Sequence, residues 1–227
     1  MTQKISPRIG RREALAMFGG AGATALLAGA TRSLPSEAAT PPACILTPEV
    51  TEGPYWIPNH LTRRNITDGK AGLPLRLRLT VVDATRCSPI RYADVELWHA
   101  DAGGVYSGFG SSASNQRFLR GHQRAGRQGF VIFDTIYPGW YQGRTPHIHL
   151  KVHIGGKVVH TGQLFFKDAT SDAVYRTSSY RAHGQPDTTN AQDMIYAQAG
   201  GSKAQVHLTK RAGGQGYDGS ITVGVRR

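Results

Sequence analysis

The chain has 227 residues, with 27 lysines and arginines against 15 aspartates and glutamates, and a formal net charge of +12. Apart from an N-terminal segment of export type, this length fits a single domain. The basic side chains are scattered and no nucleic-acid-binding motif accompanies them, which argues against a nucleic-acid-binding protein.

Residues 1–38 have the composition of an export signal. The adjacent Arg11 and Arg12 precede an apolar run, Met17 to Ala30, and a small-residue cleavage site follows. This order predicts a twin-arginine signal peptide. A membrane anchor is the alternative, but the run is shorter than the ~20 residues that a spanning helix needs. We therefore expect a mature domain of residues 39–227, periplasmic or extracellular, without a stable membrane anchor.

The chain contains two cysteines, Cys44 and Cys87. An isolated pair in an exported protein usually forms one disulfide, here between the start of the mature chain and the turn after an expected strand. Two buried thiols are the alternative. Metal binding by both cysteines is disfavoured, because thiolates suit softer sites.

The body of the chain consists of short segments in which apolar and polar residues alternate, as in half-buried strands. This spacing predicts an all-β fold, an antiparallel β-sandwich with long loops and one or two short helices. The run Phe130–Phe133 is apolar at every position and is expected to be buried on both faces. The expected strands are Leu75–Asp83, Ala93–Ala100, Phe130–Phe133, His147–Ile154, Val158–Phe166, Gln205–Leu208 and Ser220–Val225, and the expected helices are Ser171–Arg176 and Asn190–Gln198.

The strand expected at His147–Ile154 has two unlike faces. Its even-numbered residues are apolar and suit the core, whereas His147 and His149 share the opposite face. Both imidazoles can therefore reach one metal ion. With the phenolates of Tyr106 and Tyr141 they would suit oxidised iron, because phenolate is a strong anionic oxygen donor.

Four motifs occur in a fixed order between about Thr51 and Asp193. They are Trp98-His-Ala with Gly104-Val-Tyr106, Pro138-Gly-Trp-Tyr141, Arg144-Thr-Pro-His147-Ile-His149 and Gln163-Leu-Phe-Phe166. In these motifs the sequence resembles the intradiol ring-cleavage dioxygenases, and its signal resembles that of their exported branch. These enzymes cleave catechols and protocatechuate with non-haem ferric iron.

The resemblance implies one ferric ion per chain, held by four side chains. Tyr106 and His147 would lie in the equatorial plane, and Tyr141 and His149 would be axial. Tyr141 would leave the iron when substrate binds and take up a substrate proton. The reaction implied is cleavage of a catechol-type ring between its two hydroxylated carbons by dioxygen, which gives a muconate-type diacid.

The resemblance also implies that three further residues contact the substrate or the intermediates formed from it. The resemblance implies that Arg144 places a positive charge beside anionic intermediates. Gln163 would orient the substrate, and Tyr55, in a Gly-Pro-Tyr stretch, would line its pocket. The region between residues 39 and 75 is too short for the helical dimerisation region of catechol dioxygenases, so no oligomeric state is predicted.

Two other functions remain as alternatives. A β-sandwich could bind carbohydrate or peptide without catalysis. A zinc hydrolase could use His147 and His149, but it needs a third ligand, and the nearest upstream carboxylate is Asp134. The histidines outside the motif core are expected to be structural or exposed: His99, His122, His153 and His160.

Overall fold

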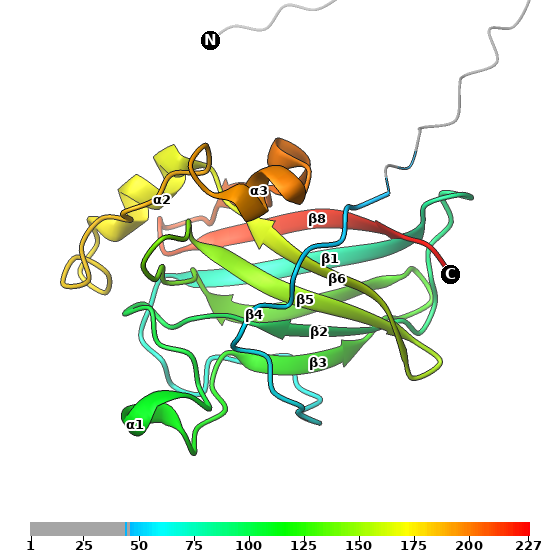
Figure 1. Ribbon diagram of the computed structural model, residues 1–227, viewed down its shortest axis with the longest axis horizontal. Helices are drawn as coiled ribbons and strands as arrows, with labels where there is room; N and C mark the ends of the chain where they lie inside the picture. Colours follow the sequence, from blue (N-terminus) through cyan, green and yellow to red (C-terminus); the bar gives the residue numbers. More distant parts are fainter. Residues whose placement is uncertain (1–43, 45) are drawn as a thin grey trace, which may run out of the picture. The chain divides into compact units, whose positions relative to one another are not determined.

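The computed structural model describes Cys44 and residues 46–227, which contain two four-stranded β-sheets (Figure 1). The strands are β1 (Pro74–Asp83), β2 (Asp94–Trp98), β3 (Arg120–Arg124), β4 (Phe130–Ile136), β5 (His147–Ile154), β6 (Lys157–Phe165), β7 (His207–Lys210) and β8 (Tyr217–Val225). The helices are α1 (Gly110–Ala113), α2 (Asp168–Tyr175), α3 (Met194–Gln198) and the 3₁₀ helix η1 (Gly201–Ala204).

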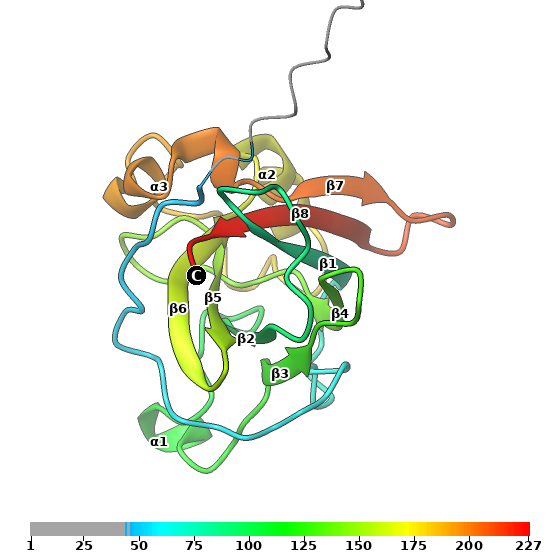
Figure 2. The same cartoon turned by 90° about the vertical axis from the view of Figure 1, so that its right-hand side faces the viewer.

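The sheets have the orders β4-β1-β8-β7 and β3-β2-β5-β6, and Figure 2 shows them as two layers. The expected β-sandwich is confirmed. One named pair departs from the antiparallel pattern, because β1 pairs with β8 in parallel. The alternation within a strand specifies its faces but not the direction of its neighbour, so the pattern does not predict this parallel pair.

The apolar face of β5 packs into the space between the sheets. Ile148, Leu150 and Val152 are buried there in one cluster with Leu77 and Leu79 of β1. Each such side chain stabilises the fold by about 1.5–3 kcal/mol relative to an exposed one. The predicted division of the strand into a core face and a polar face is therefore confirmed.

Two sequence expectations differ from the structure. β3 lies in a region expected to be a loop, because Arg120-Gly-His-Gln-Arg124 lacks apolar alternation. The run Phe130–Phe133 is buried on one face only, since Phe130 and Ile132 are half-buried. β4 is an edge strand of its sheet, and the guanidinium of Arg78 covers the Phe130 ring at 4.0 Å.

Residues 50–62, here called the covering segment, run across the polar face of the β3-β2-β5-β6 sheet (Figure 2). The amide of Val50 donates to the carbonyl of Thr161 on β6, and the amide of His122 on β3 donates to the carbonyl of Leu61. The segment therefore crosses the sheet from one edge strand to the other and encloses the face that carries His147 and His149.

Cys44 and Cys87 are joined by a disulfide, and the alternative of two buried thiols does not apply. The expected signal peptide, residues 1–38, lies outside the described residues. Among the residues that the structure does describe, none of the helices has the length and apolar character needed to cross a membrane.

Candidate metal centre

His147 and His149 meet at the start of β5, on its polar face. Their Nε2 atoms lie 3.0 Å apart, and the hydroxyl oxygen of Tyr106 lies 3.1 Å from His149 Nε2 and 3.5 Å from His147 Nε2. All three side chains are buried. The structure thus brings three of the four predicted ligand atoms to one point.

The two imidazoles are oriented by different contacts. His147 Nδ1 donates to the carbonyl of Thr145 at 2.7 Å, which leaves the lone pair on Nε2. The His149 ring stacks on Trp98, with centroids 4.9 Å apart and planes 8° apart, while its buried Nδ1 has no hydrogen-bond partner among the described residues. A hydrogen bond for one ring and a stacking contact for the other direct both Nε2 atoms to the same place.

Two glycines allow the tyrosine loops to pack closely. Tyr106 follows β2, and Tyr141 lies between β4 and β5. A Cβ atom on Gly104, where φ is +82°, would lie 2.3 Å from a carbonyl oxygen of the other loop, and one on Gly139 would lie 1.8 Å from a carbonyl oxygen of the first. Any larger residue would collide with the opposite loop, so the first tyrosine motif requires glycine at position 104 and the second requires glycine at position 139.

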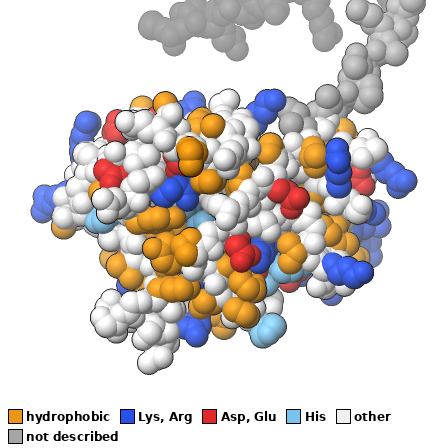
Figure 3. Space-filling model, in the orientation of Figure 1, with side chains coloured by type: hydrophobic (Ala, Val, Ile, Leu, Met, Phe, Trp, Pro, Cys, Tyr) orange, Lys and Arg blue, Asp and Glu red, His pale blue; other side chains and the backbone are white. Residues whose placement is uncertain are grey.

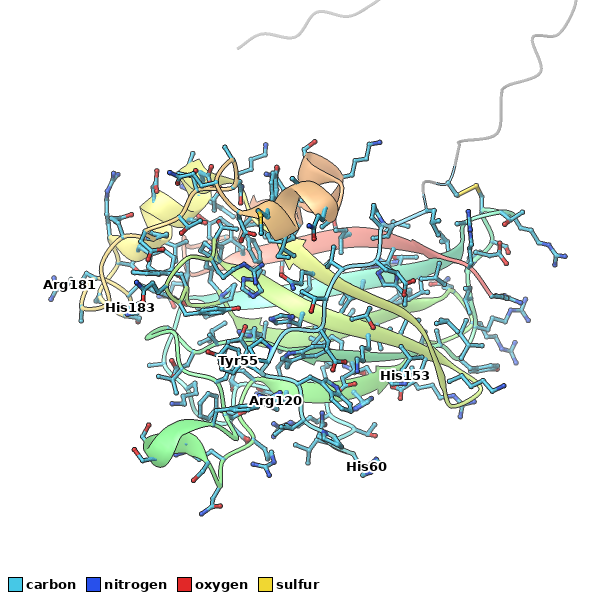
Figure 4. All side chains as sticks on the ribbon, viewed as in Figure 1. Tyr55, His60, Arg120, His153, Arg181 and His183 are labelled. Carbon is cyan, nitrogen blue, oxygen red and sulfur yellow. A yellow bond between two sulfur atoms is a disulfide. The ribbon has the colours of Figure 1, made fainter. Side chains whose placement is uncertain are left out.

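Tyr141 and Tyr55 are half-buried and lie on the more open side of the cluster. The Tyr141 ring centroid lies 5.5 Å from that of His147 and 5.8 Å from that of Tyr106. Tyr55, labelled in Figure 4, stacks on Tyr106 at 4.3 Å and meets Tyr141 edge-on at 5.4 Å. Figure 3 shows hydrophobic side chains gathered on this face of the molecule. The covering segment therefore supplies an aromatic wall beside the two predicted tyrosine ligands.

Arg144 is held at the edge of the cluster by three partners. Its Nε donates to Asp193 Oδ2 at 2.8 Å, Nη1 to the Tyr141 hydroxyl at 3.2 Å, and Nη2 to Gln163 Oε1 at 2.5 Å. Gln163 also donates from Nε2 to the carbonyl of Thr51 at 3.0 Å. Both ends of the Gln163 amide are thus bonded within the protein, the oxygen to Arg144 and the nitrogen to the Thr51 carbonyl.

Burial favours the neutral forms of the cluster. It lowers the pKa of His147 to about 3 and that of His149 well below its ordinary value. It raises the pKa of Tyr106 and of Tyr141, an effect that Arg144 partly offsets at Tyr141. Neutral imidazoles are the form that binds metals, and a cation at the meeting point would favour the phenolates.

The residues present fit an iron ion. Two imidazole nitrogens and two tyrosine oxygens are a donor set suited to it. Bonds of about 2.0–2.2 Å from a first-row metal to nitrogen or oxygen place neighbouring ligand atoms about 3 Å apart. The separations of 3.0, 3.1 and 3.5 Å among Tyr106, His147 and His149 are of that size.

Two buried charged residues beside the cluster were not singled out from the sequence. Asp193 caps α3 and also holds Arg144. Arg120 of β3 donates to the carbonyl of Ser107 and counteracts, through its charge, the raised pKa of Tyr106. An aspartate before a short helix is a visible capping signal, but its second contact depends on the fold.

The zinc-hydrolase alternative loses its candidate third ligand. Asp134 lies on β4, in the other sheet, and its two carboxylate oxygens accept hydrogen bonds from Arg64 and Arg76 at 2.8 and 3.0 Å. It therefore does not join His147 and His149.

Comparison with known proteins finds matches that cover most of the chain. A protein-family profile described as Dioxygenase matches residues 51–195. The solved intradiol ring-cleavage dioxygenase from Tetranychus urticae is 35% identical with a TM-score of 0.77, and the match covers 81% of this chain and 95% of that one. The chain belongs to the intradiol ring-cleavage dioxygenase family.

Two other relatives extend the comparison. The dioxygenase domain of a dioxygenase carbohydrate-binding protein fusion from Streptomyces sp. SirexAA-E is 30% identical with a TM-score of 0.61, over 80% of this chain and 99% of that one. Catechol 1,2-dioxygenase 1 of Acinetobacter lwoffii is 28% identical over 152 residues, 62% of this chain and 47% of that protein. The chain thus spans about half the length of this curated relative. Intradiol dioxygenases are iron-dependent and act on catechol-type substrates with dioxygen.

Proposed function

We propose that this intradiol dioxygenase cleaves the ring of a catechol-type aromatic between its two hydroxylated carbons and releases a muconate-type diacid. The observation that carries the proposal is the meeting of Tyr106 Oη, His147 Nε2 and His149 Nε2 at one buried point. Both atoms of dioxygen enter the product, so the reaction needs no external reductant. One ferric ion per chain, held by these three residues and Tyr141, would bind the catechol as a dianion and make it reactive towards dioxygen.

The remaining steps belong to the protein side chains. Tyr141, half-buried at the more open side, accepts a proton from the entering catechol at its Oη atom. The guanidinium of Arg144, 3.2 Å from that oxygen, stabilises the anionic form of the tyrosine and of the substrate. Asp193 and Gln163 hold the guanidinium in place, and Tyr55 provides a ring surface against which an aromatic substrate can pack.

The visible spectrum of the purified mature protein, recorded with its iron content, tests this proposal. We expect a burgundy band from charge transfer between tyrosinate and ferric iron, which moves to longer wavelength when catechol is added without oxygen. A colourless protein that takes up no ferric iron would instead support a carbohydrate- or peptide-binding module.

Variants separate the roles within the cluster. Tyr141→Phe should retain iron, because the three buried donors Tyr106, His147 and His149 still meet at one point, and should lose most turnover, because the proton acceptor is gone. His149→Ala should lose the metal. Tyr196→Phe is the matched control, since the Tyr196 hydroxyl contacts Gln205 rather than the cluster. Full activity in either of the first two variants would contradict the assignment.

The proposal includes export by the twin-arginine route to the periplasm or beyond. The paired Arg11 and Arg12 ahead of a weakly apolar run support it. That route carries folded proteins, which suits an enzyme that acquires its metal before export. Replacement of both arginines by lysine should leave the protein in the cytoplasm, and unchanged export would contradict the route.

A further inference from the structure

A second group of metal-binding side chains lies on the same face of the sheet, towards the β5–β6 hairpin. Glu96 on β2, His122 on β3 and His153 on β5 each place one ligand atom within 4.8 Å of the other two. Figure 4 shows His153 well separated from Tyr55 along the sheet.

We propose that Glu96, His122 and His153 form a second metal site, which binds a divalent first-row transition metal ion, Zn²⁺ being the probe of choice. Two imidazoles and one carboxylate are a common donor set for such ions.

The distances within the group match metal coordination. His122 Nε2 lies 3.6 Å from Glu96 Oε1, and His153 Nε2 lies 3.3 Å from Glu96 Oε2. Both exceed the ~2.7–2.9 Å of a charge-assisted hydrogen bond. Ligand atoms bound at ~2.1 Å in a tetrahedron lie about 3.4 Å apart. The separations of 3.6 and 3.3 Å are therefore closer to those of two ligands of one metal ion than to those of a charge-assisted hydrogen bond.

Neighbouring groups orient the proposed ligands. The Nδ1 atom of His122 is 3.1 Å from Asp94 Oδ2, whereas its buried Nε2 atom has no hydrogen-bond partner in the described part of the chain. A carboxylate behind one ring nitrogen, with the other free, is the usual setting of a metal-bound histidine. Trp56 and Asn59 both donate to Glu96 Oε1, at 3.2 and 2.9 Å, which steadies a carboxylate that is almost completely buried.

The proposed site is separate from the Tyr–His cluster. His149 and His153 are four residues apart on β5, or about 13 Å along a strand. Lys151 lies between them, with its Nζ 2.6 Å from Glu52 and 3.6 Å above the Trp56 ring. A β-bulge between Val152 and His153 interrupts the regular pairing at the proposed ligand. Bulges commonly redirect a side chain beside a functional site.

A cavity of about 650 Å³ opens onto the group. Besides Glu96 and the two histidines, Trp56, Tyr92 and Arg124 line it. A metal held from the sheet by three side chains would keep a coordination position facing this cavity, available to water or to another oxygen ligand. Two histidines and one carboxylate with an open position resemble a catalytic site more than a closed structural one.

The competing explanation is a metal-free ion cluster. Burial alone would lower the pKa of His122, but its contacts with the carboxylates of Asp94 and Glu96 outweigh this and raise that pKa to about 9. Burial alone would raise the pKa of Glu96, but its contacts with His122 and His153 lower it to about 2. A protonated His122 could therefore balance the carboxylates without a metal. The two explanations differ in whether Zn²⁺ displaces that proton.

Calorimetric titration of the iron-loaded protein with Zn²⁺ distinguishes them. We expect one bound Zn²⁺ per chain with no loss of iron. His122→Gln and His153→Gln should each weaken binding by more than ~100-fold, and Asp94→Asn by about 10- to 100-fold, the range found for groups behind a metal ligand. His207→Gln, on an exposed residue of β7, should change nothing. His149→Ala should still bind Zn²⁺, because the proposed site does not use that residue.

A crystal soaked in Zn²⁺ locates the ion directly by its anomalous scattering. A peak within about 2.0–2.2 Å of His122 Nε2 and His153 Nε2 is expected. The proposal is overturned if Zn²⁺ does not bind, if the peak lies only at the Tyr–His cluster, or if binding survives in His122→Gln and fails in His149→Ala. These results leave the dioxygenase proposal intact, since its tests measure ferric iron and ring cleavage.

Discussion

The same side chain, histidine, is placed in three chemical settings on or beside one sheet. His147 is buried and neutral, with one nitrogen fixed by a carbonyl and the other directed at Tyr106. His122 lies between carboxylates that favour its charged form. His99 is enclosed between the Ala100 carbonyl and a threonine hydroxyl, and has a structural role. Environment, rather than residue type, decides which protonation state each histidine adopts and therefore what it can bind.

The setting of His99 predicts a pH dependence of stability. Burial lowers its pKa to about 4, although the Ala100 hydrogen bond opposes this, whereas an unfolded histidine titrates near 6.5. Between about pH 4 and 6.5, His99 is therefore neutral in the native state and protonated in the unfolded state. This contribution is complete above about pH 6.5 and is lost as the pH falls towards 4, in total about 3 kcal/mol.

Denaturant unfolding of the wild type and of His99→Gln measures the effect. Between about pH 7.5 and 5 the wild type should lose about 2 kcal/mol more unfolding free energy than the variant. Groups that titrate in both proteins cancel in this difference. Parallel pH profiles for the two proteins would contradict the assignment.

Sequence patterns predicted single residues best where the chemistry is local. The spacing of His147 and His149 places both rings on one strand face whatever the rest of the fold. Tyr106 and Tyr141 were suggested by their residue type and assigned to ligand positions by the resemblance, because no local pattern predicts that their loops meet. Asp193 was missed as a partner of Arg144 because 49 residues separate them.

Elements whose two faces differ were also well predicted. β5 has the expected bounds, His147–Ile154, because one of its faces is entirely apolar. β3 was missed because it consists of glycine and polar residues, although neighbouring parts of the chain cover it. Gly121 lies against Ile66, and His122 pairs with Leu61 of the covering segment. A strand enclosed in this way needs no apolar alternation, and the sequence signal disappears.

Asp193, the N-cap residue of α3, connects this helix to the candidate metal centre through Arg144. Asp193 Oδ1 accepts from the amides of Ile195 and Tyr196, and Oδ2 accepts from Arg144 Nε and from the Thr145 amide. Asp193→Asn can keep the helix cap but replaces the oxygen that Arg144 contacts. Turnover should fall by about 10- to 100-fold through misplacement of the guanidinium, and the free energy of unfolding by about 1–3 kcal/mol.

Steady-state kinetics, with iron content and unfolding measured on the same samples, test this variant. Asp172→Asn, an exposed position on α2, is the matched control. Iron content should stay at the wild-type level, because Asp193 contacts none of the four proposed ligands except through Arg144 and Thr145. Wild-type turnover in Asp193→Asn would show that the ion pair does not position Arg144 for the reaction.

At the scale of the whole molecule, the N-terminal part of the described chain ties the two sheets together. Thr47 exchanges hydrogen bonds with Gly224 of β8, and Val50 bonds to Thr161 of β6 in the other sheet. The covering segment then supplies Tyr55 to the Tyr–His cluster and Trp56 to the Glu96 group. One continuous stretch of chain therefore encloses both proposed metal sites.

The disulfide anchors the beginning of this stretch and should stabilise the fold without entering the chemistry. Cys44 and Cys87 are 43 residues apart in sequence, and a cross-link across such a loop is worth about 2–4 kcal/mol by restricting the unfolded chain. Cys44→Ser/Cys87→Ser should lose that free energy of unfolding and retain iron and turnover in the folded state. A reductant should destabilise the wild type by the same amount and leave the double variant unchanged. If the reductant affects both proteins equally, the stabilisation does not come from this bond, and if the variant loses iron, the bond supports the Tyr–His cluster through the covering segment.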